Sequence, residues 1–367
     1  MKKRRIVLAS VLKPVDDTRM YEKMGVSLAR SGRYEVHIIG YPSNKQKDEA
    51  FVHFHSLLPF NRISFGRLAA RLKVLKTTIK LKPELIIVTT PELLIVVSLI
   101  RIFYGTKIIY DIQENYWQNI LYTNSFPKII RPLIAATVRL KETIASPLFA
   151  LLLLAEKCYA DELGFLKKKY AVIENKCKVP DGFERKQGND FVQLIFTGTL
   201  AESTGVFQAI ALAKKLHSLE PKIRLHIIGF CARPEVLQKI ENEISKSPFI
   251  SLTGGKNLVA HHSIMDAIAS ANFGIVYYPP SPHTENKTPT KLYEYLACKL
   301  PILLQNNKLW VEMCSPYNAA IVTDFNQPDV KTILDQMRET NFYSTDPEGV
   351  TWQAEEKKFL EAIDSLK

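Results

Sequence analysis

The segment HTENKTPTKLYEYLACKLPILL, residues 283–304, has the pattern of a loop, a helix and a strand. It follows FGIVYY (273–278), an apolar run of strand length. Thr290 comes after Pro289 and is a plausible N-cap, from which the helix would continue through Leu296. A strand, a loop, a helix and a second strand in this order form a βαβ unit. The start of the helix is therefore expected near the carboxyl end of the first strand.

The same alternation extends over most of the chain. Apolar runs of strand length are separated by segments with helical periodicity, as in a parallel sheet flanked by helices. The clearest expected helices cover residues 17–31, 64–81 and 352–366. The other expected strands are RIVLAS (5–10), YEVHIIG (34–40), ELIIVTT (84–90), KIIYDI (107–112), LLLLA (151–155), YAVIE (170–174), VQLIFTG (192–198), IRLHIIG (223–229) and FISLTG (249–254).

A polar, turn-rich stretch, VPDGFERKQGND (179–190), interrupts this alternation before it restarts. At 367 residues the chain also suits two domains better than one. We therefore expect an α/β protein with two Rossmann-like domains facing across a cleft, one over residues 1–180 and one over 181–349. The last helix, 350–367, could pack back on the first domain. Ligands of such sheets bind at the carboxyl ends of the strands, so the crevice between the domains is the expected place for chemistry.

The composition excludes several classes of protein. Hydrophobic residues make up 46% and charged residues 23%, which argues against a disordered or fibrous chain. The longest apolar runs, 93–100 and 148–155, are shorter than the ~18 residues that a membrane-spanning helix needs. The apolar run after MKKRR has the length of a strand, not of a signal peptide. Because the five cysteines are odd in number and form no C-x-x-C pair, we expect reduced thiols in a cytoplasmic protein.

The net charge of +12 comes from the N-terminal half. Residues 1–185 contain 31 Lys and Arg against 17 Asp and Glu, whereas residues 186–367 contain 18 against 20. Residues 61–83 contain seven basic residues and no acidic one. An apolar stripe at helical spacing runs through them: Phe65, Leu68, Leu72, Leu75 and Ile79.

This apolar stripe could face the core of the domain, or the helix could lie on an anionic membrane surface. The segment 128–141 also combines basic and apolar residues, which favours a peripheral contact with the inner face of the cell membrane. Nucleic acid is not expected as a partner. Its binding surfaces usually interleave aromatic residues or glycine with the basic ones, and the helix has only Phe65.

The helix that begins near Thr290 carries two side chains suited to a nucleotide. A helix N-terminus offers backbone N–H groups and a partial positive charge, both of which suit a diphosphate. Lys291 adds a full positive charge. Glu294 lies on the same face, where its carboxylate could accept hydrogen bonds from two ribose hydroxyls. A solvated Lys–Glu pair on a surface helix is the alternative interpretation.

The string P-x-K-L-x-E-Y-x-A-x-x-x-P over residues 289–301 resembles the donor signature of GT-B glycosyltransferases of the large retaining family four. The resemblance implies that Glu294 binds the donor ribose. It implies that Lys291 and the helix start at Thr290 and Leu292 bind the diphosphate. It further implies transfer of a sugar from a nucleoside diphosphate sugar to a hydroxyl, with retention of anomeric configuration. No metal and no separate cofactor are expected, provided that Lys291 and the helix dipole neutralise the leaving diphosphate.

The loop before this helix departs from the family pattern, which places a Glu eight positions before Glu294. Asn286 holds that position and Glu285 precedes it, so either residue could contact the transferred sugar.

The segment FTGTLAESTG (196–205) resembles the Gly-rich loop of the same family. Thr204 stands where the family usually has a phosphate-binding Arg or Lys. Thr199 and Thr204 remain possible hydroxyl donors, and a tight turn at Gly198 is the alternative interpretation. The strand ends at Gly229, Phe230 and Gly255 could sandwich a base, although ordinary turns explain them about as well.

The N-terminal domain supplies the candidates on the acceptor side. Asp17 and Arg19 follow the first strand, where they could shape the loop or touch the donor phosphate; a capping Asp beside a solvated Arg is the alternative. KIIYDIQENY (107–116) resembles the D-x-H-E segment of the family, with Gln113 in place of His. Since Gln cannot accept a proton, Asp111, Glu114 or the donor phosphate would have to do so. The predicted catalytic residues are Lys291, Glu285, Asn286, Glu114 and Gln113.

The expected function is thus retaining, metal-independent transfer of a hexosyl group from a nucleotide sugar to a hydroxyl. The acceptor would be a lipid-linked or polysaccharide precursor at the inner membrane surface. A glycosyltransferase-like subunit that binds nucleotide or a partner protein without catalysis is the alternative. The residues at positions 113, 204 and 286 each replace a group that the family uses.

Overall fold

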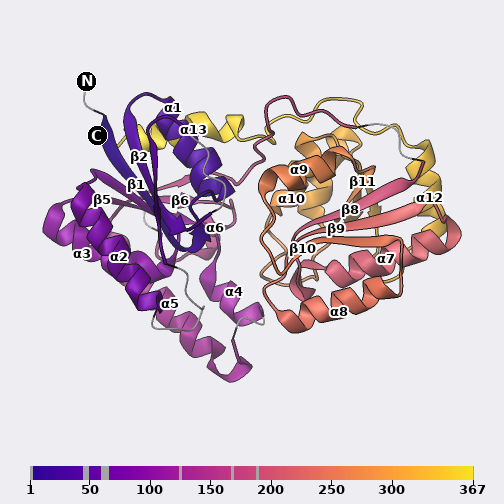
Figure 1. Cartoon of the computed structure of the whole chain (residues 1–367), viewed down its shortest axis with the longest axis horizontal. Coiled ribbons are helices and arrows are strands. Elements are labelled where there is room, and N and C mark those ends of the chain that lie inside the picture. Colours follow the sequence, from indigo (N-terminus) through magenta and orange to yellow (C-terminus); the bar gives the residue numbers. More distant parts are fainter. Residues whose placement is uncertain are drawn as a thin grey trace. The chain divides into compact units, whose positions relative to one another are not determined.

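The structure is a computed structural model, and it describes residues 3–43, 49–58, 66–123, 126–166, 169–186 and 190–366. The chain forms two compact units, shown in Figure 1. Unit 1 comprises Met1–Asn175 and Trp352–Lys367, and unit 2 comprises Lys176–Thr351. The sequence had suggested a boundary between residues 180 and 181.

Unit 1 is built on a seven-stranded sheet in which every recorded strand pairing is parallel. Its strand order is β3-β2-β1-β4-β5-β6-β7, so the direction of winding reverses between β1 and β4. The strands span Arg4–Pro14 (β1), Tyr34–Tyr41 (β2), Val52–Ser56 (β3), Leu85–Val88 (β4), Lys107–Ile112 (β5), Phe149–Leu154 (β6) and Tyr170–Val172 (β7).

Helices cover both faces of this sheet. One face packs on η1, α1 and the C-terminal α13 through an apolar core that includes Met24, Leu28 and Phe359. The other face packs on α2, α3 and α5 through Val74, Val97 and other residues. The helices span Thr18–Gly25 (η1, a π-helix), Val26–Arg30 (α1), Gly66–Leu81 (α2), Pro91–Leu93 (η2), Leu94–Tyr104 (α3), Tyr116–Tyr122 (α4), Lys128–Ile130 (η3), Arg131–Ala145 (α5), Ser146–Leu148 (η4), Tyr159–Glu162 (α6) and Gln353–Asp364 (α13).

One of the two predictions for α2 is that its apolar stripe faces the core, and the structure shows a different face turned to the sheet. Small residues form it, namely Ala70, Val74 and Thr78, and these let the helix approach the sheet closely. The predicted apolar stripe therefore does not face the core. Of that stripe, Leu68 and Leu72 are exposed, Leu75 and Ile79 are half-buried, and Phe65 lies outside the described residues.

Unit 2 repeats the architecture with a six-stranded parallel sheet of order β10-β9-β8-β11-β12-β13. One core joins it to α7, α8 and α12, and a second joins it to α9, α10 and α11. The elements span Val192–Thr199 (β8), Glu202–Thr204 (η5), Val206–Leu219 (α7), Ile223–Phe230 (β9), Pro234–Ser245 (α8), Ile250–Gly255 (β10), His261–Ala269 (α9), Phe273–Val276 (β11), Thr290–Ala297 (α10), Ile302–Gln305 (β12), Lys308–Cys314 (α11), Ser315–Tyr317 (η6), Ala320–Thr323 (β13) and Val330–Glu339 (α12).

The predicted fold class is confirmed: the protein is α/β, with two parallel sheets covered by helices. The five cysteines are free thiols. Within the described part of the chain, no helix has the length and apolar character needed to cross a membrane.

Candidate functional site

The candidate site of unit 2 lies where its strand order reverses. Strands β8 and β11 are neighbours, but their following helices cover opposite faces of the sheet. The loops after the two strands therefore diverge, and ligands of open α/β sheets bind at such a point. The loop after β8 runs over residues 200–205. The loop after β11 leads to the start of α10 at Thr290.

Lys291 occupies the first turn of α10 and points into this region as a buried cation. Only 5% of the residue is exposed, and its Nζ has no hydrogen-bond partner among the described residues. Nζ lies 3.6 Å from the centre of the Phe196 ring and 5.4 Å from that of Tyr278. Burial lowers the pKa of Lys291 to about 7, although the nearby charge of Glu294 opposes this shift. An ammonium that lies over aromatic faces and makes no hydrogen bond to the described residues is suited to receive an anion.

Glu294 lies one turn further along α10 and is also buried. Its Oε1 is 3.6 Å from Nε2 of His261, the first residue of α9. The carboxylate of Glu294 therefore has Lys291 as a neighbour on its own helix and the imidazole of His261 as a neighbour on α9. No sequence pattern points to His261, because a His-His pair at a helix start has no recognisable spacing to Glu294. The contact between His261 and Glu294 arises because α9 packs beside α10 on the same face of the sheet.

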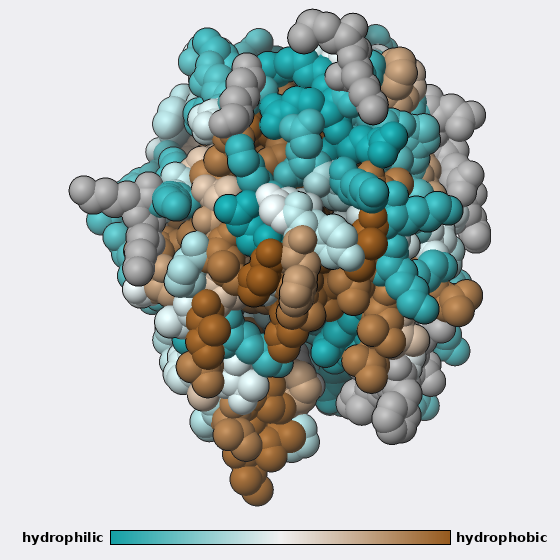
Figure 2. All heavy atoms as spheres, turned by 90° about the vertical axis from the view of Figure 1, so that its left-hand side faces the viewer, coloured by the Kyte–Doolittle hydropathy of each residue, from teal (hydrophilic) through white to brown (hydrophobic). Residues whose placement is uncertain are grey.

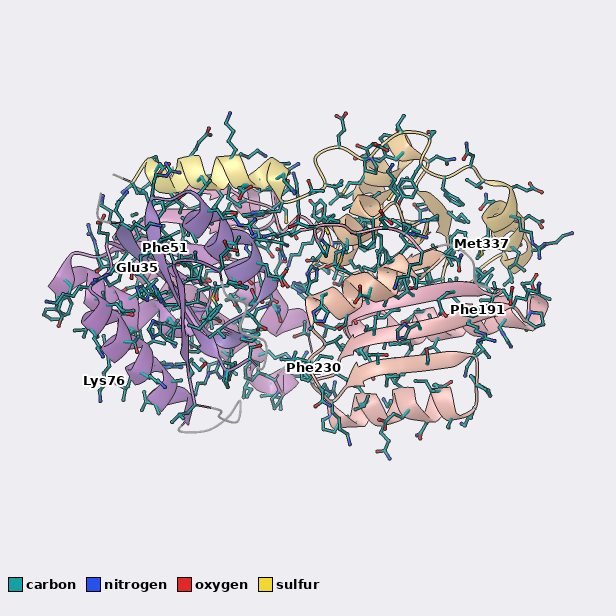
Figure 3. The ribbon with its side chains drawn as sticks, turned by 45° about the horizontal axis from the view of Figure 1, so that its top comes forward. Glu35, Phe51, Lys76, Phe191, Phe230 and Met337 are labelled. Atoms are coloured by element: carbon teal, nitrogen blue, oxygen red, sulfur yellow. The ribbon has the colours of Figure 1, made fainter. Side chains whose placement is uncertain are left out.

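Three glycines lie at the ends of β8, β9 and β10, and we call them the glycine ledge. Gly198, Gly229 and Gly254 are aligned in register across the three strands. A Cβ atom at Gly229 would lie 1.7 Å from the carbonyl oxygen of Gly198, so no larger residue fits there. The ledge ends at Phe230, which is half-buried at the end of β9 (Figure 3). Gly229 is buried, whereas Gly198 is half-buried and Gly254 exposed, so a flat ring or a phosphate could approach the main chain at those two glycines.

The loop after β8 is held rigid by Thr204. Its hydroxyl donates to the carbonyl oxygen of Thr199 at 2.7 Å and accepts from the N–H of Ala201 at 3.1 Å. A hydroxyl has a single proton, so Thr204 is committed to the loop. The next residue, Gly205, has φ +80°, and a Cβ there would come within 2.7 Å of the Tyr277 carbonyl oxygen. Thr199 is exposed at the strand end.

The loop that precedes α10 is anchored to α11. Asn307 Nδ2 donates to the carbonyl oxygen of Glu285 at 3.0 Å, and Trp310 Nε1 donates to that of Lys287 at 2.7 Å. The side chains of Glu285 and Asn286 are both exposed. The backbone of this loop is thus fixed, while its two predicted sugar contacts point to solvent.

The start of α10 differs in detail from the prediction. Pro289 occupies the N-cap position, and Thr290 is the first helical residue. Proline fixes φ near the value required at a helix start, so it sets the direction of entry without a side-chain cap. Leu292 is fully buried in the core of unit 2, so its side chain cannot touch a ligand. Gly255, which ends β10, is buried as well.

In unit 1, the predicted residues Arg19 and Asp111 form a buried ion pair. The guanidinium NH2 group lies 2.7 Å from Asp111 Oδ1, and Nε lies 3.0 Å from Oδ2. Gln113 donates its amide to Oδ2 at 2.8 Å, and Arg19 also donates to the carbonyl oxygen of Ile173. Both oxygens of Asp111 are therefore occupied. The pair fastens the start of η1 to the end of β5.

Asp17 and Glu114 have simpler surroundings. Asp17 caps η1 by accepting hydrogen bonds from the N–H groups of Arg19 and Met20, as the capping alternative predicted. Arg19 itself is buried and not solvated. Glu114 is exposed and accepts a hydrogen bond from the amide of Asn119. Of the predicted proton acceptors in unit 1, only Glu114 is open to solvent.

The described side chains also bear on metal binding. Among them, no group of three or more His, Cys, Asp or Glu residues is arranged to hold a metal ion.

No protein-family model matches this sequence, and no curated protein matches it either. Solved structures do match over nearly full length. Sucrose-phosphate synthase from Thermosynechococcus elongatus superposes with a TM-score of 0.74 at 12% identity, covering 99% of each chain. The catalytic domain of starch synthase IV from Arabidopsis thaliana, bound to ADP and acarbose, gives 0.68 at 11% identity over 100% of this chain and 99% of that one. HepE from Anabaena in complex with UDP-glucose gives 0.67 at 13% identity over 98% of this chain and 99% of that one.

These similarities rest on shape, since the identities are too low to carry more than the fold. They extend over both units and both sheets. The chain therefore has the GT-B fold, the two-domain α/β architecture that these glycosyltransferase structures share.

Proposed function

We propose that the protein is a glycosyltransferase that moves a sugar from a nucleoside diphosphate sugar to a hydroxyl acceptor. The observation that carries this proposal is Lys291. A buried ammonium, with no hydrogen-bond partner in the described part of the chain, stands in the first turn of a helix beside the switch point of a parallel sheet. Glu294 on the same face can accept hydrogen bonds from ribose hydroxyls. The similar structures with UDP-glucose and with ADP are consistent with such a donor.

In this proposal, unit 2 binds the donor and stabilises its leaving group. Lys291 and the N–H groups at the start of α10 neutralise the charge that develops on the diphosphate. The glycine ledge with Phe230 receives the base. Asn286 and Glu285 contact the transferred sugar, whose configuration is retained. Because Asp111 is engaged with Arg19 and Gln113, the acceptor proton goes to Glu114 or to the donor phosphate.

The acceptor in this proposal is a lipid-linked or polysaccharide precursor. Its support is the excess of basic residues in the N-terminal half, which suits an anionic membrane surface. The protein would then act in the cytoplasm as a peripheral protein at the inner face of the cell membrane, and no nucleic acid would be involved.

A non-catalytic, glycosyltransferase-like subunit is the second candidate function. Two departures from the family pattern favour it, because the side chains of Gln113 and Thr204 are bound into the protein's own structure. Neither can accept a proton or neutralise a phosphate. Such a subunit would still bind a nucleotide through Lys291 and Glu294.

Nucleotide release from a panel of UDP-, GDP- and ADP-sugars, with membrane lipid extract as the acceptor, tests the proposal. We expect release from one donor. We expect at least a tenfold loss with Glu294→Gln, because hydrogen bonds to a charged group are worth about 1.5–3 kcal/mol each. The nucleotide's 2′-deoxy analogue should bind more weakly than the parent to the wild type but about equally well to the variant. Binding without release from any donor would favour the non-catalytic subunit, and the absence of binding would refute both.

The pH dependence of donor binding should report the state of Lys291. In the protein without donor, Lys291 has a pKa of about 7. A bound diphosphate favours the ammonium form of its side chain. Binding should therefore take up nearly one proton at about pH 8 and much less at about pH 6, and affinity should fall as the pH rises above the pKa. The donor's diphosphate is esterified at both ends and does not titrate in this range.

Calorimetry in buffers of different ionisation enthalpy measures this proton uptake. His261 and Glu294 also lie at the site, so Lys291→Met serves as the control. Uptake that persists in this variant would assign the titration to one of those residues and contradict the prediction.

A further inference from the structure

The outward face of α3 in unit 1 is apolar. Its exposed residues are Ile95, Leu99, Ile102, Phe103 and Tyr104, and Phe103 has 74% of its surface exposed. The opposite side of the same helix is buried in the core through Val97 and its neighbours. A helix with apolar residues on its outward face as well as its buried face is normally covered on both sides.

The outward face of α5 has the same character. Leu133 (71% exposed), Leu140 and Ile144 follow one another at helical spacing along its solvent side. Just before the helix, Ile129 is 94% exposed and Ile130 is exposed as well. Small residues and a polar network face inward instead, including Ala135 and the buried Glu142.

Helices α2, α3 and α5 form one continuous layer, because α3 packs against both others. Figure 2 faces the side of the molecule that carries this layer and shows apolar side chains gathered across its lower half. We call the exposed apolar residues of α3, η3 and α5, together with Leu68 and Leu72 of α2, the apolar face.

The charge around the apolar face has one sign. Helices α2, α3, η3 and α5 contain ten Lys and Arg residues and a single acidic residue, Glu142, which is buried. On α2, the exposed Lys73, Lys76 and Lys80 continue beyond the apolar positions, and Lys76 lies on the outer side of the helix (Figure 3). Exposed apolar side chains bordered by basic ones are typical of helices that lie in the interface of an anionic bilayer.

We propose that the apolar face docks onto an anionic lipid bilayer, with the apolar side chains of α3 and α5 inserted into the interface and the lysines of α2 contacting headgroup phosphates. This deepens the proposed function by naming the surface through which a lipid-linked acceptor is reached. A second copy of the chain is a poor occupant, because a two-fold interface brings the same patch onto itself and would set basic residues against basic residues.

Co-sedimentation with vesicles tests the docking. The vesicles are phosphatidylcholine alone and phosphatidylcholine with about one third phosphatidylglycerol. The wild type should bind the anionic vesicles, bind the neutral ones far more weakly, and lose binding as salt is added. The double variant Ile102→Glu, Leu133→Glu should bind at least about tenfold more weakly, because each carboxylate would have to enter the interface. Lys76→Ser with Lys80→Ser should give a smaller loss, confined to anionic vesicles.

Leu219 and Leu258 of unit 2 provide the matched control, since they are leucines of similar exposure far from these helices in sequence. Leu219→Glu with Leu258→Glu adds the same charge and should leave binding unchanged. Absence of binding by the wild type, or an equal loss in both double variants, would overturn the inference. So would a wild-type dimer in light scattering that Ile102→Glu converts to a monomer.

The donor site provides an independent readout. Both double variants should fold and bind nucleotide as the wild type does, measured by circular dichroism and by thermal shift. If vesicles bind but no nucleotide does, the proposed function fails and the docking surface stands. If nucleotide binds but vesicles do not, the docking surface fails and the proposed function stands.

Discussion

Lys291→Met is expected to stabilise unit 2 while it weakens donor binding. Burial lowers the pKa of Lys291 from 10.5 to about 7. A shift of this size corresponds to at most about 5 kcal/mol of destabilisation, and relaxation around the charge reduces it, so we expect a gain of about 2 kcal/mol. Methionine keeps the length of the side chain and packs well against the rings of Phe196 and Tyr278.

The size of this stabilisation depends on pH in a defined way. The folded-state pKa of Lys291 lies below that of the unfolded chain, so the penalty is complete at and below about pH 7. It disappears as the pH rises toward 10.5. The advantage of Lys291→Met should therefore be largest in neutral and acidic solution and shrink in alkaline solution.

Thermal unfolding at several pH values, together with nucleotide titration, measures both consequences. The melting temperature of unit 2 should rise by about 5 °C near neutral pH. Nucleotide affinity should fall by about a hundredfold, since the variant lacks the only full positive charge identified at the start of α10. Lys308→Met is the control, because Lys308 opens the neighbouring helix α11 and is exposed. A destabilised Lys291→Met protein, or one with unchanged affinity, would contradict the assignment of Lys291 to the donor.

The order of strands and helices could be predicted from the sequence because apolar periodicity reports local structure. The strands at 34–40 and 107–112 agree with β2 and β5. The strand β3 was missed because a hydrophobic pattern is not distinctive over five residues. The helix α12 was also missed, although its apolar residues have helical spacing. For α2, the helix was predicted correctly, but periodicity could not decide which of its two apolar faces is buried.

The candidate site could be predicted only where its residues are close in sequence. Lys291 and Glu294 share one turn of α10, so helical spacing alone places them together. His261 reaches Glu294 from another helix, and Arg19 reaches Asp111 across 92 positions of the chain. Contacts of this kind depend on how elements pack, which no local pattern encodes. The sequence therefore proposed Asp111 as a proton acceptor, whereas the structure shows it paired.

Asp111→Ala is expected to destabilise unit 1 by about 3–5 kcal/mol, since it leaves the guanidinium of Arg19 buried without its carboxylate. In a unit of this size the melting temperature should fall by about 10 °C. The double variant Arg19→Met, Asp111→Leu removes both charges and should recover most of the loss, because a buried ion pair contributes little net stability beyond apolar packing. Asp17→Ala is the control: it removes the cap of η1 and the contact of Asp17 with Lys13 but strands no buried guanidinium, and it should cost about 1 kcal/mol. Denaturation of the full chain, followed by two probes, measures the stability of the wild type and of the three variants. If Asp111→Ala were as stable as the wild type, the ion pair with Arg19 would not be needed for folding. The role of the Asp111 carboxylate as proton acceptor would then have to be reconsidered.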